Sequence, residues 1–182
     1  MLRKLATTAL SVLLVSSLAG AQEPRKDLQV FNDVAREVTR YSRFTVFDDV
    51  SVSVDNGAVT LAGKVTMPYK ARDLERVVSR VAGVVSVHNR LVVLPVSFFD
   101  DELRYRISRA IYGNPGFWHY AAMANPPIHI VVENGRVTLT GVVSSNVERM
   151  MAQSLARSSN AFAVVNRLRT DAEVKADLER FD

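Results

Sequence analysis

The chain has 182 residues and a mass of 20.2 kDa, which leaves room for one ordinary domain or two small ones. Hydrophobic residues make up 48% and charged residues 23%, values close to the globular average that argue against disorder, collagen and coiled coil. The absence of cysteine excludes disulfide scaffolds, thiolate metal sites and cysteine nucleophiles. The net charge is +4, and setting aside Arg3 and Lys4 of an expected leader leaves 21 basic against 19 acidic residues, too small an excess for a dedicated nucleic-acid binder.

Residues 1–21 have the pattern of a secretory signal peptide. Arg3 and Lys4 open it, an apolar run follows, and the small residues AGA at 19–21 place the expected cleavage before Gln22. A transmembrane anchor is the alternative, but it needs about 20 predominantly apolar residues, and serines and threonines interrupt this run. We therefore expect a protein exported to the periplasm. Without cysteine, it has no residue for a lipoprotein anchor.

The rest of the sequence contains an internal duplication. Residues 54–65 read VDNGAVTLAGKV and residues 132–143 read VENGRVTLTGVV, with eight of these twelve positions identical. The likeness resumes as VHNRLVV at 87–93 and VVNRLRT at 164–170. Such self-similarity indicates two copies of one structural module.

The expected copies span 27–94 and 99–170, followed by an acidic C-terminal helix or tail at 171–182. Modules of about 70 residues have marginal cores on their own, so we expect the two to pack on each other. Each copy reads as a helix, two strands, a second helix and a last strand. Three strands cannot bury both faces of a sheet alone. The expected fold is therefore α+β, with two tandem αββαβ modules, each a three-stranded sheet covered on one face by two helices.

In the first copy, apolar spacing predicts helices over 28–41 and 69–81 and strands over 50–54, 59–65 and 84–94. Asn56-Gly57 between alternating apolar residues predicts a tight hairpin, because both central residues need positive φ. Gly63 predicts a bulge or a close backbone approach in the return strand. Gly83 predicts the C-terminal end of the second helix.

The second copy repeats this order with the turn at Asn134-Gly135 and the strand glycine at Gly141. No glycine aligns with Gly83. Ala161-Phe162 and a deletion of one residue stand there instead, so the second helix of this copy is expected to end differently.

The repeated segments resemble the BON (bacterial OsmY and nodulation) domain. The residues that carry the resemblance are NGAVTLAGKV at 56–65, VAGVVSVHNRLVV at 81–93, NGRVTLTGVV at 134–143 and VVNRLRT at 164–170. The resemblance implies a bacterial protein without catalytic activity, associated with phospholipid or cell-envelope surfaces and with envelope or osmotic stress. A soluble periplasmic role similar to that of OsmY fits a chain that has no cysteine for the acyl anchor of dual-BON lipoproteins.

Motifs for catalysis or metal binding are absent from the sequence. It has no phosphate-binding loop, nucleophile elbow, His-Glu-x-x-His or dinucleotide-binding glycine motif. His119 and His129 have no acidic neighbour that would orient a metal ligand, so no metal site is expected. The acidic run Asp100-Asp101-Glu102 precedes a helix, where carboxylates cap free N–H groups. We expect neither an enzyme nor a cofactor.

Charge and aromatic content distinguish the second copy. Between Leu103 and Thr170 there are eight arginines, two acidic residues and no lysine. An insertion at 112–127 adds a cluster of aromatic residues among glycines and prolines. Two interpretations of this cluster remain open: the rings pack into the core, or they form an amphipathic wedge at a membrane interface, where Trp and Tyr are favoured.

The leading hypothesis is peripheral binding to anionic phospholipid or envelope surfaces. Its candidate residues are Arg104, Arg106, Arg109, Phe117, Trp118 and Tyr120. The alternative is a protein–protein or chaperone-like module whose exposed sheet faces or edges hold client chains of the envelope by strand addition.

Overall fold

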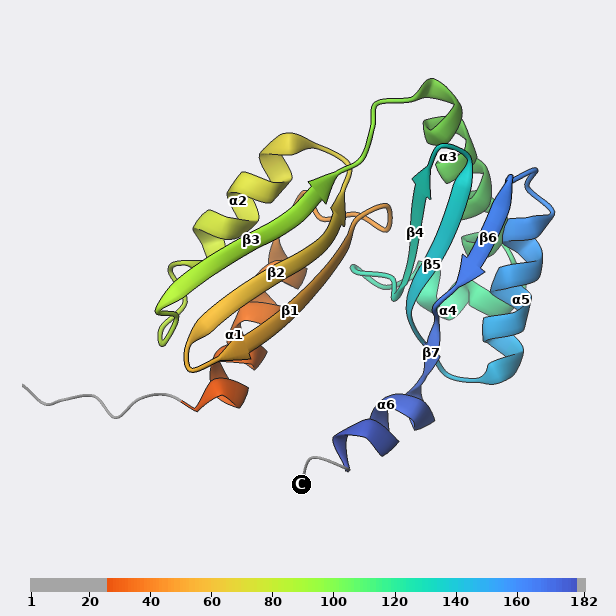
Figure 1. The fold of residues 1–182 in the computed structure, drawn as a ribbon. Coiled ribbons are helices and arrows are strands. Elements are labelled where there is room, and N and C mark those ends of the chain that lie inside the picture. Colours follow the sequence, from red (N-terminus) through yellow and green to blue (C-terminus); the bar gives the residue numbers. More distant parts are fainter. Residues whose placement is uncertain (1–25, 180–182) are drawn as a thin grey trace, which may run out of the picture.

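The computed structural model describes residues 26–179. The predicted signal peptide lies outside the described residues. Two modules follow one another along the chain, each built around its own sheet, and a C-terminal helix leaves the second module (Figure 1). Within the described part of the chain, no helix is both long and apolar enough to span a membrane.

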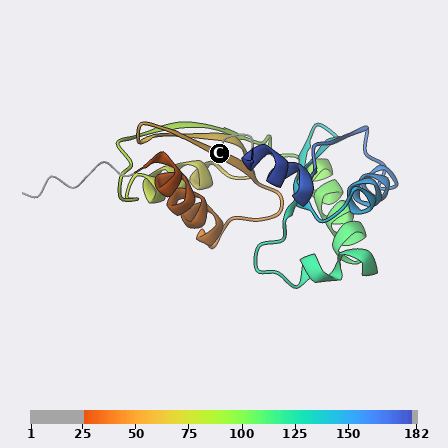
Figure 2. The same cartoon turned by 90° about the horizontal axis from the view of Figure 1, so that it is seen from below.

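The first module has the predicted order of elements. It consists of α1 (Asp27–Arg40), β1 (Asp49–Asp55), β2 (Ala58–Val65), α2 (Pro68–Val78) and β3 (Ser86–Val93). The sheet order is β1-β2-β3, with β1 antiparallel and β3 parallel to β2. Figure 2 shows α1 and α2 together on one side of this sheet. Their valines and leucines bury against the inward side chains of β2, which forms the core.

The second module repeats the order with an inserted segment. It consists of α3 (Phe98–Tyr112), η1 (Pro115–Phe117), α4 (Trp118–Ala121), β4 (Ile128–Glu133), β5 (Arg136–Val143), α5 (Asn146–Arg157), β6 (Ala163–Asn166) and β7 (Arg169–Thr170), and α6 (Asp171–Leu178) follows. Both β6 and β7 pair with β5 in parallel and in one register, so they form a single interrupted strand. The fold is the predicted α+β pair of modules.

The hairpin turns adopt the predicted left-handed backbone. Asn56 and Gly57 have φ of 50° and 76°, and Asn134 and Gly135 have φ of 52° and 73°. A carboxylate from the start of the preceding helix binds each turn. In the second module the oxygens of Asp100 accept from the backbone N–H groups of Asn134 and Gly135, both at 2.8 Å.

Asp27 accepts in the same way from the turn of the first module, at 2.7 and 2.9 Å. The carboxylate of Asp100 therefore caps the hairpin turn, whereas Ser97 supplies the oxygen that caps α3, so the prediction that Asp100 caps its own helix is wrong. The carboxylate at the start of the first helix fixes the hairpin tip to that helix in both modules.

The strand glycines permit the close backbone approach that the sequence predicts. A Cβ on Gly63 would lie 2.1 Å from the carbonyl oxygen of Asp49, and one on Gly141 would lie 1.8 Å from that of Pro127. Both glycines also have positive φ, 124° and 111°. Any side chain at either position would therefore displace the neighbouring strand.

Gly83 does not end the second helix, so that prediction is wrong. Helix α2 ends at Val78 with Ser79 as its C-cap, and Gly83 lies in the following turn with φ of 89°. In the second module Asn160 stands at the matching place with φ of 62°. Asparagine is the residue other than glycine that best tolerates this conformation, which is why the second copy needs no glycine there.

The two modules pack on each other, as expected for small repeats. The loop 41–48 of the first module reaches the second, where the carbonyl of Val46 accepts from the N–H of Ile130 at 2.6 Å. The ring of Phe47 lies edge-on to Tyr105, with 5.3 Å between centroids. Lys64 and Glu133 form an ion pair between the sheets. These contacts hold the first strands of the two sheets, β1 and β4, beside each other (Figure 1).

Candidate functional site

Among residues 26–179, no group of three or more His, Asp and Glu side chains could hold a metal ion. Two open hollows of about 450 and 470 Å³ lie on the outside of the first module and are lined by side chains of α1 and α2, by the turn after α2 and by the start of β3. The exposed surface is therefore the place to look for function.

The arginines predicted on α3 differ sharply in availability. Arg104 is buried, and its guanidinium donates to the carbonyl of Val132 at 2.6 Å and pairs with Asp101. Arg106 is partly engaged by Glu102 at 2.7 Å and by the carbonyl of Ser159 at 3.2 Å. Arg109 is exposed. The prediction that Arg104 faces an anionic surface is therefore not supported, because its guanidinium group is buried and bound to partners within the module.

The aromatic cluster divides between core and surface. Phe117 is fully buried and Tyr120 is 5% exposed, and both belong to the core of the second module. Trp118 between them is 62% exposed. Phe117 and Tyr120 are three residues apart in consecutive helical turns, so both face the core, whereas Trp118 and His119 between them face outward. The wedge interpretation thus fails for Phe117 and Tyr120 and remains open for Trp118.

Tyr120 anchors the insertion to α5 through a small polar network. Its hydroxyl donates to Glu148 at 2.8 Å and lies 2.9 Å from the hydroxyl of Ser144. Burial raises the pKa of Tyr120, and the carboxylate of Glu148 raises it further. His119 lies 3.8 Å from the same carboxylate. The insertion is therefore a rigid part of the second module.

Exposed apolar side chains and partly exposed arginines lie on α4, on the start of α5 and on β7 of the second module. We call this region the α4–α5 end. Its apolar members are 62 to 70% exposed, although large apolar side chains usually lie inside. Its members are Trp118, Val147 and Met150 with the cations Arg149 and Arg169.

Four residues of this region are not predicted as site residues from the sequence: Val147, Arg149, Met150 and Arg169. The spacing of Val147, Met151 and Leu155 predicts that Val147 lies on the buried stripe of this helix, yet it is 68% exposed. Apolar spacing along a helix does not show which of its apolar residues pack against another element and which stay exposed. One signal could have identified Val147 and Met150: α5 carries more apolar residues than a single buried stripe accommodates.

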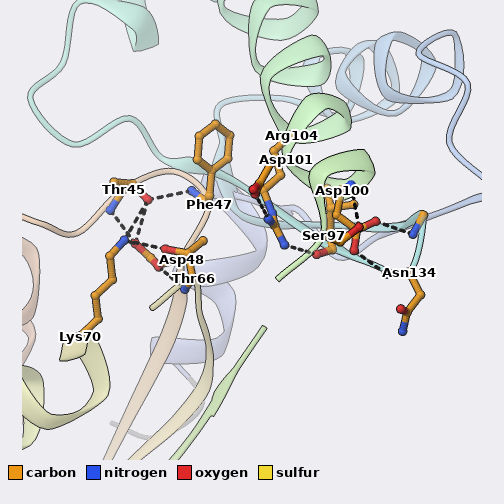
Figure 3. Close-up of polar contacts among 12 residues, drawn as sticks. Thr45, Phe47, Asp48, Thr66, Lys70, Ser97, Asp100, Asp101, Arg104 and Asn134 are labelled. Carbon is orange, nitrogen blue, oxygen red and sulfur yellow. Dashed lines mark hydrogen bonds and ion pairs between the residues drawn. The ribbon is translucent and has the colours of Figure 1, made fainter. Parts of the chain in front are cut away.

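A buried ion pair in the first module was also missed. Asp48 and Lys70 are 0% and 4% exposed, and the ammonium lies 2.6 Å from the carboxylate (Figure 3). The carboxylate also accepts from the backbone N–H groups of Thr45 and Thr66, at 2.9 and 2.8 Å. Full satisfaction of both charges, with the site at the module junction, indicates a structural role for this cluster.

Two tandem αββαβ modules define the class of small tandem-repeat α+β proteins. The family model of the BON domain matches residues 33–95 and 100–172, which is most of the chain. The chain therefore belongs to the BON domain family.

The curated proteins contain no match to the chain. One similar solved structure is CdsD, a structural protein of the type III secretion system of Chlamydia trachomatis. It is 16% identical, with 81% of this chain and 97% of that chain covered and a TM-score of 0.28. The C-terminal domain of CdsD is 14% identical, with coverage of 79% and 98% and a TM-score of 0.29. Likeness at this level carries no information about function.

Proposed function

We propose that this BON-domain protein acts in the periplasm, without catalysis, as a peripheral binder of anionic phospholipid or cell-envelope surfaces during envelope or osmotic stress. The observation that carries the proposal is that Trp118, Val147 and Met150 are exposed on the module that also carries the cations Arg149 and Arg169. Apolar side chains next to cations are the combination that an anionic membrane interface favours.

The expected binding free energies indicate that both arginines and apolar side chains are needed for membrane binding. Each arginine near an anionic surface contributes about 1 kcal/mol, so two or three cations alone give affinities weaker than about 1 mM. Burying a large apolar side chain adds about 1.5–3 kcal/mol. Arginines together with Trp118 and one aliphatic neighbour therefore reach roughly micromolar affinity. Binding should weaken with salt and should also require the tryptophan.

The alternative function is the binding of client chains by strand addition. It is disfavoured at β3, the longest strand at a free sheet edge. Strand β3 lies at the edge of the first sheet, but the side chain of Asn89 accepts from the N–H of Leu91 at 3.1 Å. The same amide donates to the carbonyl of Ala71 at 3.0 Å, which holds it in place. An incoming strand would find this N–H already occupied. The matching edge of the second module is interrupted between β6 and β7.

Trp118 gives a direct test because it is the single tryptophan of the chain. With vesicles of phosphatidylcholine and phosphatidylglycerol, its emission should shift to the blue and the protein should cosediment; vesicles of phosphatidylcholine alone should do neither. Trp118→Ala should weaken cosedimentation by roughly tenfold or more, from the loss of about 1.5–3 kcal/mol of apolar burial.

The matched control is Phe98→Ala, which removes an aromatic ring that is 84% exposed at the start of α3, away from the α4–α5 end. It should leave binding unchanged. Equal losses in the two variants, or cosedimentation without any shift in emission, would contradict the proposed surface.

Export is tested separately. The chain expressed with its leader should appear in the periplasm with Gln22 as its first residue, and deletion of residues 2–21 should leave it in the cytoplasm. N-terminal sequencing of the exported protein provides the measurement. A periplasmic or membrane-bound product that begins at Met1 would show that the segment is an anchor.

A further inference from the structure

Helix α6 is attached to the second module mainly through charged side chains. The carboxylate of Glu173 pairs with the guanidinium of Arg149 at 2.9 and 3.2 Å. Arg169 pairs with the carboxylate of Asp177 and donates to the carbonyl of Glu173 at 3.2 Å. Two arginines of the α4–α5 end are therefore occupied by two carboxylates one helical turn apart on α6.

Apolar packing contributes little to this attachment. None of the described side chains of α6 belongs to either hydrophobic core, and most of them are exposed. The helix is stable at its start because Thr170 and Glu173 form a capping box. Electrostatic contacts between half-exposed groups are screened by salt and give way to competing charges. The attachment of α6 to the module is therefore easily broken and re-formed.

The charges of α6 and of the module beneath it are opposite. Residues 171–182 contain five acidic and two basic residues, whereas 103–170 contain eight arginines and two acidic residues. The backbone N–H of Thr170 and the guanidinium of Arg149 lower the pKa of Glu173, which keeps its carboxylate charged as the pH falls. The tail therefore places fixed negative charge on the most basic module.

We propose that Arg149 and Arg169 form an anion-recognition site for phospholipid headgroups, and that α6 is its intramolecular occupant, displaced when the α4–α5 end meets an anionic membrane. The inference rests on the proposed function and adds its regulation. Carboxylates of α6 and headgroup phosphates present the same chemistry to the two guanidinium groups. The tail then sets a threshold of surface charge below which the protein stays unbound.

The test uses a charge-matched pair of variants. Glu173→Gln with Asp177→Asn removes both pairing carboxylates and keeps the capping box, since glutamine serves it as well as glutamate. The control, Asp171→Asn with Glu179→Gln, removes the same charge from α6 and leaves both arginine pairs intact. Binding to vesicles of phosphatidylcholine and phosphatidylglycerol is measured at low salt for both variants and the wild type.

We expect the pairing variant to bind about thirtyfold more tightly than the wild type, as two freed arginines imply, and the control to bind clearly less tightly than the pairing variant. Adding Arg149→Gln and Arg169→Gln to the pairing variant should reverse the gain. Equal tightening in both variants would overturn the inference and leave the proposed function standing. Absence of vesicle binding by the wild type and every variant would overturn both.

A measurement without lipid tests the attachment itself. Amide hydrogen exchange over 172–178 should be faster in the pairing variant than in the wild type, and high salt should accelerate it in the wild type alone. Exchange that is the same in both proteins and at both salt concentrations would overturn the inference, because the carboxylate pairs would then not hold α6.

Discussion

The two modules place different chemistry at one equivalent position. The third residue of the second helix is Lys70 in the first module and Glu148 in the second. Lys70 reaches the buried carboxylate of Asp48, whereas Glu148 accepts from the hydroxyl of Tyr120, which the inserted α4 supplies. In both modules this position holds a charged side chain with a hydrogen-bond partner. The fold accepts either sign of charge there.

This difference shows why the insertion belongs to the second module. A carboxylate at the start of a helix is favoured by the helix dipole, and an ammonium there is disfavoured. The first module compensates Lys70 with a fully buried aspartate. The second needs only a hydroxyl donor for Glu148, which α4 provides, and the adjoining η1 adds Phe117 to the core. The aromatic insertion thus replaces an ion pair.

Disrupting the Asp48–Lys70 pair and the Glu148–Tyr120 contact separately should give the largest difference in the free energy of unfolding. Asp48→Asn leaves the ammonium of Lys70 buried without a counter-charge, which should lower the free energy of unfolding by about 3–5 kcal/mol. Glu148→Gln loses one charged hydrogen-bond acceptor at a partly exposed site and should lower it by about 1–2 kcal/mol. Urea unfolding followed by circular dichroism measures both, and Trp118 emission isolates the second module.

The double variant Asp48→Leu with Lys70→Met provides the control. It removes both charges together and should recover most of the stability lost in Asp48→Asn. A double variant as unstable as the single one would show that the hydrogen bonds to Thr45 and Thr66 matter more than the charge pair.

The hairpin glycines sharpen the comparison at intermediate magnitude. Gly57→Ala and Gly135→Ala both place a side chain at positive φ, which costs about 1 kcal/mol. At Gly57 the new Cβ would also lie 2.8 Å from the carbonyl oxygen of Gly83, whereas at Gly135 its nearest contact is 3.4 Å away. Gly57→Ala should therefore lower the thermal midpoint more. Equal midpoints would show that the turn of the first module can shift away from Gly83.

One feature should behave alike in the two modules. Asn89 and Asn166 each bridge the last strand to the second helix, donating to a helix carbonyl at 3.0 and 2.9 Å. Replacing either with alanine should lower the free energy of unfolding by a similar amount, about 1–2 kcal/mol, because each leaves polar backbone groups without partners. A marked difference in urea unfolding would mean that the interrupted strand of the second module depends on this bridge more than β3 does.

The smallest expected effect concerns pH. His129 and Ser51 occupy equivalent places in β4 and β1, but only His129 is covered, by Phe44 of the first module at 5.4 Å between ring centroids. Burial lowers the pKa of His129 below 6.5, and the neighbouring carboxylates of Asp49 and Asp48 oppose this shift.

The unfolded chain therefore takes up the proton first as the pH falls. Stability should be complete above pH 6.5 and decline as the pH drops from there toward the lower folded pKa. In urea titrations between about pH 7 and pH 5, His129→Gln should flatten this dependence. An unchanged slope would show that His129 does not gain its charge on unfolding.

Local patterns sufficed for the repeat, the order of elements and the turns. Asn56-Gly57 and Gly63 act through backbone conformation and close approach, which the residue type itself restricts. Gly83 was misplaced because a glycine after an apolar stripe indicates positive φ without saying how far the helix extends. Asn160 was overlooked because asparagine tolerates that conformation yet occurs in many others.

The candidate surface could be predicted only in part. Trp118 and Phe117 are neighbours in sequence with the same apolar character, yet one is 62% exposed and the other fully buried. Burial depends on what packs against a side chain, and here the partners come from α3, β4 and α5, well away along the chain.

The sequence by itself determined that this protein is a tandem pair of αββαβ modules with most of its arginine in the second, because turn chemistry, periodicity and composition are properties of short segments. Only the tertiary structure decided which of those arginines face outward and which aromatic ring does. Arg104 is held inside by the carbonyl of Val132, and Arg149 lies beneath α6. The availability of a charge depends on its partners in space, and those partners are set by packing between distant segments.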